Sequence, residues 1–309
     1  MSSPAWRGVV QMSYGGRAGG GDQPRNGDVS WDQRQRFMLL EACVIWNGAL
    51  RLGDLRDAFD ISTGKAERDV TAYRQRCPHN LRQDPETGHW LAADRFEPAF
   101  LRGTAEELLA VLRNHAITGD LPLAMAAVGN VSAEVLEPPQ RNFDVRVLAR
   151  IHTAIRERRQ LQIEYQSMSR PQPRALVVEP HVLVFTGRWH ARAWSESHQQ
   201  FRDLLLSRIR GQPVLAGKAS REPRLDWDWQ HQVSVKVAPH PGLSPAQKQV
   251  VEQDYGMQRG MIEKPVRLAL VPYYLRMLGI GRGDAEREPA EQQIVLLNVD
   301  ELDAFNRLG

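Results

Sequence analysis

Residues 32–91 constrain the fold most, because three helical patterns are followed there by a polar hairpin. Apolar side chains recur at helical spacing over residues 32–46 and again over the shorter stretch 52–59. Residues 62–75 make a third amphipathic helix, and residues 80–91 place two short strands around a polar turn. Three helices and a hairpin in this order predict a winged helix-turn-helix.

The third predicted helix has two faces of opposite character. Ser62 is suited to cap it, and Ala66, Val70 and Tyr73 stand at positions i, i+4 and i+7, which predicts one buried stripe. The opposite face carries donors that suit bases and phosphates, although an ordinary amphipathic surface helix has the same pattern. The residues predicted to contact DNA are those of this face and one arginine of the hairpin: Thr63, Gly64, Lys65, Arg68, Thr71, Gln75 and Arg82.

The apolar period changes from 3.6 to 2 after residue 159. Short alternating stretches then follow one another up to residue 206 with no helix between them, which predicts a small β-barrel or a strongly bent sheet. From residue 216 onward strands and helices alternate, which indicates a small α+β unit.

The charge of the chain is unevenly distributed. Residues 1–145 hold 16 Lys+Arg against 19 Asp+Glu, residues 146–224 hold 15 against 6, and residues 225–309 hold 9 against 12. Every cation of the middle segment except Lys218 is arginine, whose planar fork suits phosphate, so we expect that segment to bind an anion. The alternative is a solvated basic surface.

Composition excludes several classes of protein. No apolar run is long enough to span a membrane, and the Gly-, Ser- and Arg-rich start has no hydrophobic core of a secretory signal. Cys43 and Cys77 lack the spacing of metal ligands, so we expect free thiols, no cofactor and a cytoplasmic location.

Four segments of the middle part resemble a WYL domain: residues 161–167, the triplet 179–181, residues 187–194 and residues 206–209. The run 65–73, with Asn80-Leu81 after it, is similar to WYL repressors that accompany the BREX and CBASS anti-phage systems. This resemblance implies a homodimer whose winged helices bind a palindromic double-stranded operator. It also implies an SH3/Sm-like barrel that senses a ligand, and a C-terminal unit that dimerises. The chain departs from the family at Trp189-His190-Ala191, which replaces the Trp-Tyr-Leu triplet.

The predicted fold class is therefore α+β with three folded parts. We expect a disordered tail over residues 1–29, a winged helix-turn-helix over 30–100 and a helical linker over 101–145. A WYL domain over 146–215 and a C-terminal α+β dimerisation domain over 216–309 complete the chain.

Strand alternation, together with the resemblance, gives a candidate ligand pocket. Trp189, Ala191 and Ala193 are predicted to face the core, and the alternate residues of that strand to face a ligand. An imidazole, a guanidinium and an aromatic surface on one face suit a nucleotide or a single strand of nucleic acid. The predicted ligand-binding residues are Tyr165, Ser167, His181, His190, Arg192 and Arg208.

Three functions fit these observations to different degrees. The first is a transcriptional repressor whose DNA binding is modulated by a nucleotide or nucleic acid in the WYL domain. The second is an activator of the same architecture that single-stranded DNA switches on. The third, an enzyme, is disfavoured because the sequence has no metal-binding, nucleophile-elbow or Gly-rich phosphate-loop signature.

Overall fold

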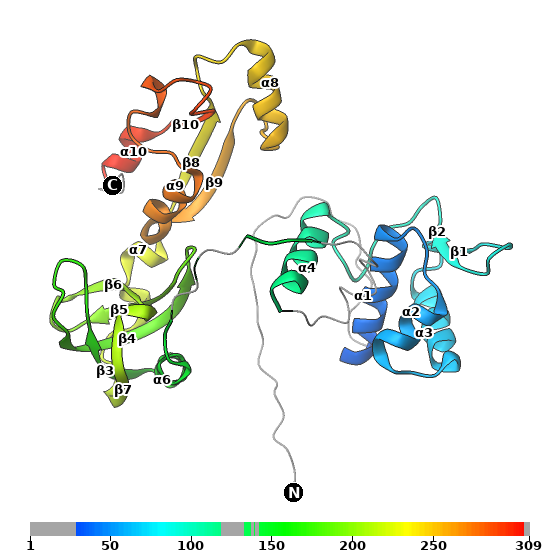
Figure 1. Cartoon of the computed structure of the whole chain (residues 1–309), viewed down its shortest axis with the longest axis horizontal. Coiled ribbons are helices and arrows are strands. Elements are labelled where there is room, and N and C mark those ends of the chain that lie inside the picture. The colour runs from blue at the N-terminus through cyan, green and yellow to red at the C-terminus, as the bar shows by residue number, and fades with distance from the viewer. Residues whose placement is uncertain (1–28, 119–132, 137–138, 140–141, 306–309) are drawn as a thin grey trace, which may run out of the picture. The chain divides into compact units, whose positions relative to one another are not determined.

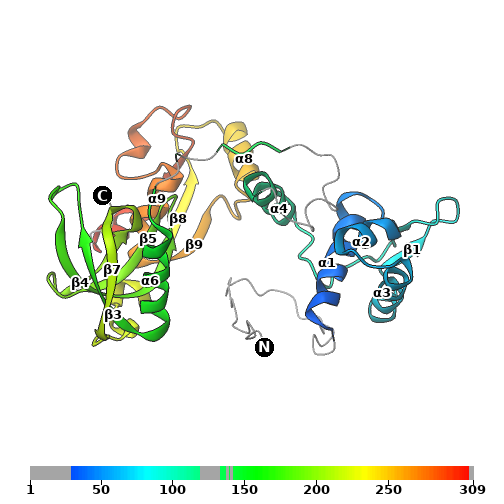
Figure 2. The ribbon, with the colours of Figure 1, turned by 60° about the horizontal axis from the view of Figure 1, so that its bottom comes forward.

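The computed structural model describes residues 29–118, 133–136, 139 and 142–305, and it divides the chain into two compact units at residue 137. Figures 1 and 2 show these units from two directions. The predicted tail of residues 1–29 lies almost wholly outside the described residues, as does part of the linker predicted over residues 101–145.

The first unit begins with the predicted three helices and hairpin. Ser30 and Ser62 accept hydrogen bonds from the amide nitrogens of Gln33 and Lys65 and so cap α1 and α3. An isolated bridge pairs Leu50 with Trp90 and attaches the hairpin to the start of α2. The winged helix-turn-helix prediction is confirmed by elements with these bounds: α1 Trp31–Trp46, α2 Leu52–Phe59, α3 Thr63–Arg76, β1 Leu81–Gln83, β2 Trp90–Ala92 and then α4 Ala105–Thr118.

A buried carboxylate organises the core of this unit. Glu41 of α1 accepts hydrogen bonds from the hydroxyl of Tyr73 at 2.8 Å and from the backbone amides of residues 99–101 at 2.7–2.9 Å. Asn80 in turn donates to the Tyr73 hydroxyl at 2.9 Å. The network therefore fixes α3 to α1 and to the segment that leads into α4.

The second unit starts with α6 and a five-stranded antiparallel sheet in the order β6-β5-β4-β3-β7. Val147, Ile151 and Ala154 of α6 are buried in the same core as the inward residues of the sheet, so the helix covers one sheet face (Figure 2). The elements are α6 Val145–Glu157, β3 Arg159–Tyr165, β4 Arg174–Phe185, β5 Trp189–Ser195, β6 Gln200–Leu205, the 3-10 turn η2 Leu206–Arg208 and β7 Ile209–Lys218.

Two features of the sheet were not anticipated from the sequence. Strand β4 continues through Pro180, because a register shift between Pro180 and Val182 absorbs the proline. Strand β7 was missed and extends past the predicted boundary at residue 215. No ladder joins β6 to β7 in the described part of the chain, so closure into a barrel remains a prediction.

The remainder of the second unit is the predicted α+β part, with a three-stranded antiparallel sheet in the order β10-β8-β9. Strand β9 begins at Ile262, and the residues after Arg267 form a 3-10 turn. The elements are α7 Trp227–Gln230, β8 Gln232–Pro239, α8 Pro245–Asp254, β9 Ile262–Arg267, η4 Leu268–Leu270, α9 Val271–Leu278, β10 Ile294–Leu296 and α10 Val299–Asp303. Among the described residues no helix has the length and apolarity needed to cross a membrane.

Candidate nucleic-acid interface and effector groove

Helix α3 presents the predicted polar face to solvent. Its apolar stripe is buried as expected, with Ala66 and Tyr73 at 0% and Val70 at 2% exposure. Four of the residues predicted to contact DNA are exposed on this helix: Thr63, Arg68, Thr71 and Gln75. Gly64 has open space around it, since an added Cβ would meet only the end of the Arg68 side chain, at 3.7 Å. The backbone at the start of α3 is therefore accessible to a large ligand.

Lys65 also forms an ion pair inside the domain, which was not predicted from the sequence. Its Nζ lies 3.2 Å from Oδ1 of Asp69, a carboxylate that is 1% exposed. Asp69 also accepts from Nε of Arg36 at 2.6 Å and from the amide of Gln33 at 3.2 Å. This cluster connects α3 to α1. The Asp69 carboxylate therefore partly neutralises the positive charge of Lys65 within the domain.

Two arginines lie at the wing, one on β1 and one on α3. Arg82, predicted from the sequence, is exposed on β1 opposite Leu91. Arg74, which was not predicted, is exposed on α3 and lies over the ring of Trp90 at 4.8 Å from its centroid. Since a guanidinium is attracted to an aromatic face, this contact connects α3 to β2 and holds a cation at the edge of the polar face.

A groove of about 630 Å³ lies in the second unit between β5, β6 and α9. We call it the effector groove. It combines five guanidinium groups with two carboxylates, of Asp203 and Asp228. Five of the six predicted ligand-binding residues line it, which are Tyr165, Ser167, His190, Arg192 and Arg208.

His190 is the most unusual residue of the groove. It is 3% exposed, its Nδ1 has no hydrogen-bond partner among the described residues, and its Nε2 lies 3.3 Å from the Thr186 hydroxyl. Burial lowers its pKa below the ordinary value, with the charges of Arg188 and Arg208 acting in the same direction and Asp203 opposing them. Within the described part of the chain Nδ1 is buried as well as unpaired, so a ligand can form a hydrogen bond with it only if the side chains around it move.

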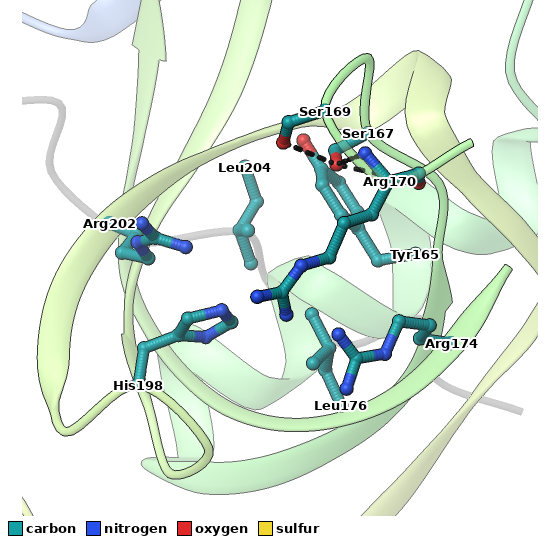
Figure 3. A pocket seen from close by; sticks show the side chains of 9 residues that line it. All are labelled: Tyr165, Ser167, Ser169, Arg170, Arg174, Leu176, His198, Arg202 and Leu204. Atoms are coloured by element: carbon teal, nitrogen blue, oxygen red, sulfur yellow. Dashed lines mark hydrogen bonds between the residues drawn. The ribbon is translucent and has the colours of Figure 1, made fainter. Parts of the chain in front are cut away.

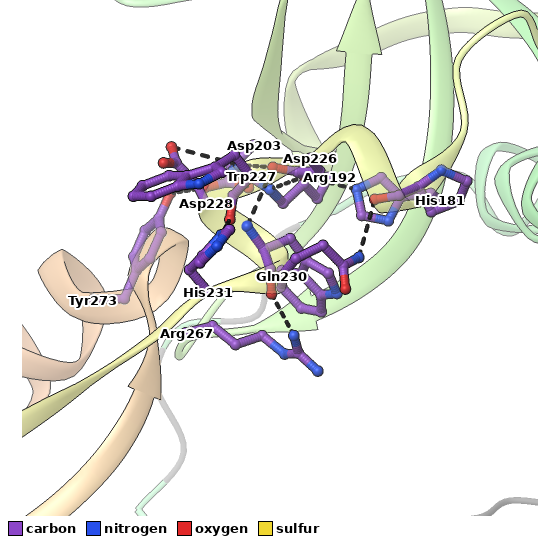
Figure 4. A network of polar contacts seen from close by, with 12 residues as sticks. His181, Arg192, Asp203, Asp226, Trp227, Asp228, Gln230, His231, Arg267 and Tyr273 are labelled. Carbon is purple, nitrogen blue, oxygen red and sulfur yellow. Dashed lines mark hydrogen bonds and ion pairs between the residues drawn. The ribbon is translucent and has the colours of Figure 1, made fainter.

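Arg192 is engaged in a buried ion network rather than free for a ligand (Figure 4). Its Nε and Nη2 donate to Asp226 at 2.6 and 2.8 Å, and its Nη1 donates to Asp203 at 3.1 Å. The hydroxyl of Tyr273 on α9 donates to the second oxygen of Asp203 at 3.0 Å. The network therefore connects the sheet, the start of α7 and α9 at the floor of the groove.

Two more of the predicted ligand-binding residues, His181 and Tyr165, form hydrogen bonds within the protein. His181 does not line the groove, because its Nε2 pairs with Asp226 at 2.9 Å and its ring meets Phe201 and Trp229 edge-on. The hydroxyl of Tyr165 accepts the backbone amide of Leu205 at 3.1 Å. Their assignment as ligand-binding residues stays a prediction.

Trp189 corrects the predicted strand faces. Ala191 and Ala193 are buried in the core as expected, but Trp189 is 46% exposed and packs on Phe185 near the hairpin turn. The alternation holds for the middle of β5 and fails at its first residue, because the core does not extend that far along the strand.

A second, smaller cavity of about 180 Å³ adjoins the groove and shares Tyr165, Ser167, Arg202 and Leu204 with it. We call it the arginine cup (Figure 3). Its other lining residues are Ser169, Arg170, Arg174, Leu176 and His198. None of its arginines was predicted, and the only sequence signal for them was the excess of arginine in the middle segment.

A winged helix-turn-helix followed by an antiparallel sheet and a small α+β unit is the architecture of a modular DNA-binding regulator. Comparison with known families gives three matches in the same order along the chain. Residues 32–114 match the winged helix-turn-helix domain of the BrxR transcriptional regulator, residues 146–212 the WYL domain, and residues 232–302 the C-terminal dimerization domain of BrxR.

Curated relatives cover almost the whole chain. A DNA-binding transcriptional repressor CapW from Stenotrophomonas maltophilia is 35% identical over 90% of this chain and 94% of its own length. The CapW repressors of Escherichia coli (strain KTE188) and Pseudomonas aeruginosa are 32% and 30% identical over 92% and 95% of their lengths. The chain belongs to the BrxR/CapW family of WYL-domain transcriptional repressors associated with phage defence, and this family is not one of enzymes.

Proposed function

We propose that this protein is a sequence-specific DNA-binding repressor that acts as a homodimer on a palindromic operator, within the cytoplasm, at a phage-defence operon. The exposed polar face of α3 carries the proposal, because it offers guanidinium, hydroxyl and amide donors on a helix fixed by buried contacts. The relatives' description as DNA-binding repressors supports it. Dimerisation through residues 232–302 is supported by the match to a dimerization domain.

In such a dimer the two α3 helices would enter successive major grooves, about 34 Å apart or a multiple of it. Arg68, Thr71 and Gln75 are suited to base edges or phosphates, and Arg82 to the backbone beside the wing. Lys65 is expected to contribute less than its charge suggests, because Asp69 holds it.

We further propose that an anionic effector, a nucleotide or a nucleic acid, binds the WYL domain and shifts the dimer between DNA-competent and DNA-incompetent states. Four arginines of the groove form no ion pair among the described residues, and together with the imidazole of His190 they support an anionic, base-bearing ligand: Arg188, Arg202, Arg208 and Arg276. Such a ligand changes operator affinity only if its own affinity differs between the two states.

Fluorescence-polarisation binding to the DNA upstream of the gene, against a scrambled duplex at fixed salt, tests the first proposal. A specificity ratio of roughly a thousand or more is expected, and Arg68→Ala should abolish it. Arg113→Ala is the matched control, since Arg113 is an exposed arginine of α4, away from α3. Equal and salt-sensitive binding to both duplexes would contradict the operator-binding role.

The same architecture would serve an activator that single-stranded DNA switches on. Deleting the gene in a reporter strain distinguishes the two, because loss of a repressor raises expression from the operator and loss of an activator lowers it.

A further inference from the structure

We propose that the arginine cup is a subsite for a terminal phosphate, that is, for a phosphomonoester dianion at the end of the effector. This inference rests on the proposed sensing of an anionic effector and makes it specific. The cup holds three guanidinium groups and one imidazole above an apolar floor of Leu176 and Leu204. Figure 3 shows the side chains of Arg170, Arg174 and His198 converging over that floor.

The arginines stand where the hydrophobic core of the sheet ends. In the strand register Arg174 is opposite Tyr165, and Leu176 is opposite Ile163 of the core. Arg202 is opposite Ala193, which is fully buried. Residues directly opposite each other share a sheet face. Arg174 and Arg202 therefore lie on the same sheet face as the core but beyond its edge, where both side chains are exposed.

The cup contains positive charge that the described protein does not neutralise. No carboxylate lines it, and within the described residues none of the guanidinium groups of Arg170, Arg174 and Arg202 forms an ion pair. Three like charges brought to one small cavity repel one another unless an anion joins them. All three side chains are exposed, so water and salt screen part of this repulsion, and an anion bound among them would remove more of it.

Local hydrogen bonds hold the cup in shape. The Ser167 hydroxyl accepts the Arg170 amide at 3.0 Å, and the Ser167 amide donates to the Arg170 carbonyl at 3.1 Å, which makes a tight turn. The hydroxyls of Ser195 and Ser197 lie 2.8 and 3.0 Å from Nδ1 of His198. When either hydroxyl donates to Nδ1, the imidazole carries its proton on Nε2 and can donate it to a ligand. Ordered donors reduce the cost of binding.

Charge and size favour a terminal phosphate over a phosphate inside a chain. A phosphodiester carries one negative charge, whereas a phosphomonoester carries about −1.5 to −2 at pH 7 and offers three acceptor oxygens. Three guanidinium groups match the dianion better, and each can bind two oxygens at once. Because the cup shares four residues with the effector groove, a ligand whose phosphate lies in the cup can extend its nucleoside into the groove. A free nucleotide and the end of a single strand share this chemistry.

Titration calorimetry with the full chain tests the proposal on two pairs of probes. One pair is hexathymidylate with a 5′-phosphate or with hydroxyl ends, and the other is thymidine 5′-monophosphate or thymidine. We expect the phosphate to tighten binding by about tenfold to a hundredfold. Arg170→Gln and Arg174→Gln should remove this preference, and Arg150→Gln, which changes an exposed arginine of α6 outside the cup, should leave it unchanged. All three sites are exposed, and unchanged melting temperatures would verify folding.

The outcomes separate this inference from the broader proposal. If both hexathymidylates bind equally well and weaken operator binding, the effector is anionic but the terminal-phosphate subsite is wrong. If only the mononucleotide shows the Arg170-dependent preference, the subsite stands and its ligand is a free nucleotide. If no phosphate-bearing probe binds better than its partner, the subsite is refuted, and the operator assay still decides the repressor role.

Discussion

Replacing Asp226 with asparagine should lower the free energy of unfolding of the second unit by about 3 kcal/mol. The Asp226 carboxylate is 1% exposed and accepts hydrogen bonds from Nε2 of His181, from Nε and Nη2 of Arg192 and from the amide of Trp229. Removing one member of a buried ion pair costs about 3–5 kcal/mol, because the other charge remains unpaired in the interior. The lower end applies here, since Asp203 still lies 3.1 Å from the Arg192 guanidinium.

The stability lost in Asp226→Asn should be larger at neutral pH than in acid. Burial raises the pKa of Asp226, and the hydrogen bonds from His181 and Arg192 outweigh burial, so its pKa in the folded protein lies below the ordinary value. A carboxyl group with a lowered folded pKa stabilises the protein above its unfolded pKa, which is about 3.9 for aspartate, and loses this effect as pH falls further. The difference between wild type and Asp226→Asn should therefore be full at pH 7 and narrow below about pH 4.

Urea unfolding followed by tryptophan fluorescence measures this effect, because Trp229 packs on His181 beside the network. A lower midpoint at unchanged slope indicates a true loss of stability. In a double-mutant cycle with Arg192→Gln, the double variant should lose about 1–3 kcal/mol less than the sum of the single losses. A midpoint shift equivalent to under about 1 kcal/mol, or additive single losses, would refute the ion-network reasoning.

Three further predictions concern the first unit. Tyr73→Phe removes a donor to Glu41 and an acceptor for Asn80, so it should cost about 1–3 kcal/mol of stability in urea unfolding; an unchanged midpoint would contradict this. Burial, aided by the charge of Asp54, raises the pKa of Cys43 to about 12, so its thiol should react with a disulfide reagent at pH 8 only after denaturation. Arg74→Ala should weaken operator binding in fluorescence polarisation with a stability loss under about 1 kcal/mol, because its cation–π contact is exposed; unchanged affinity would show that this cation does not contact DNA.

Local patterns in the sequence were sufficient to predict the helices of the first unit. The apolar stripe of α3 and its cap at Ser62 depend on residues within one or two helical turns, and both are present. Strand alternation likewise predicted the burial of Ala191 and Ala193. It failed at Trp189, since the extent of a core along a strand depends on what packs against that strand.

The ligand residues were harder to predict, because their partners are distant in sequence. The middle of the chain predicted an arginine-rich anion site, but charge counts do not distinguish an arginine in an ion pair from one without a partner. Arg192 meets Asp226, and His181 meets the same carboxylate, across 34 and 45 positions of sequence. Arg170 in the turn after β3 and Arg202 on strand β6 line the same cavity.

The sequence by itself determined the order of the domains, the helices of the winged helix-turn-helix and the basic character of the sensing domain, because these follow from composition and short-range periodicity. Only the tertiary structure decided which cations are neutralised inside the protein and which remain available to a ligand. The physical reason is that charge pairing depends on distances of about 3–4 Å between atoms of different strands, and those distances exist only once the sheet has bent and packed against its neighbours.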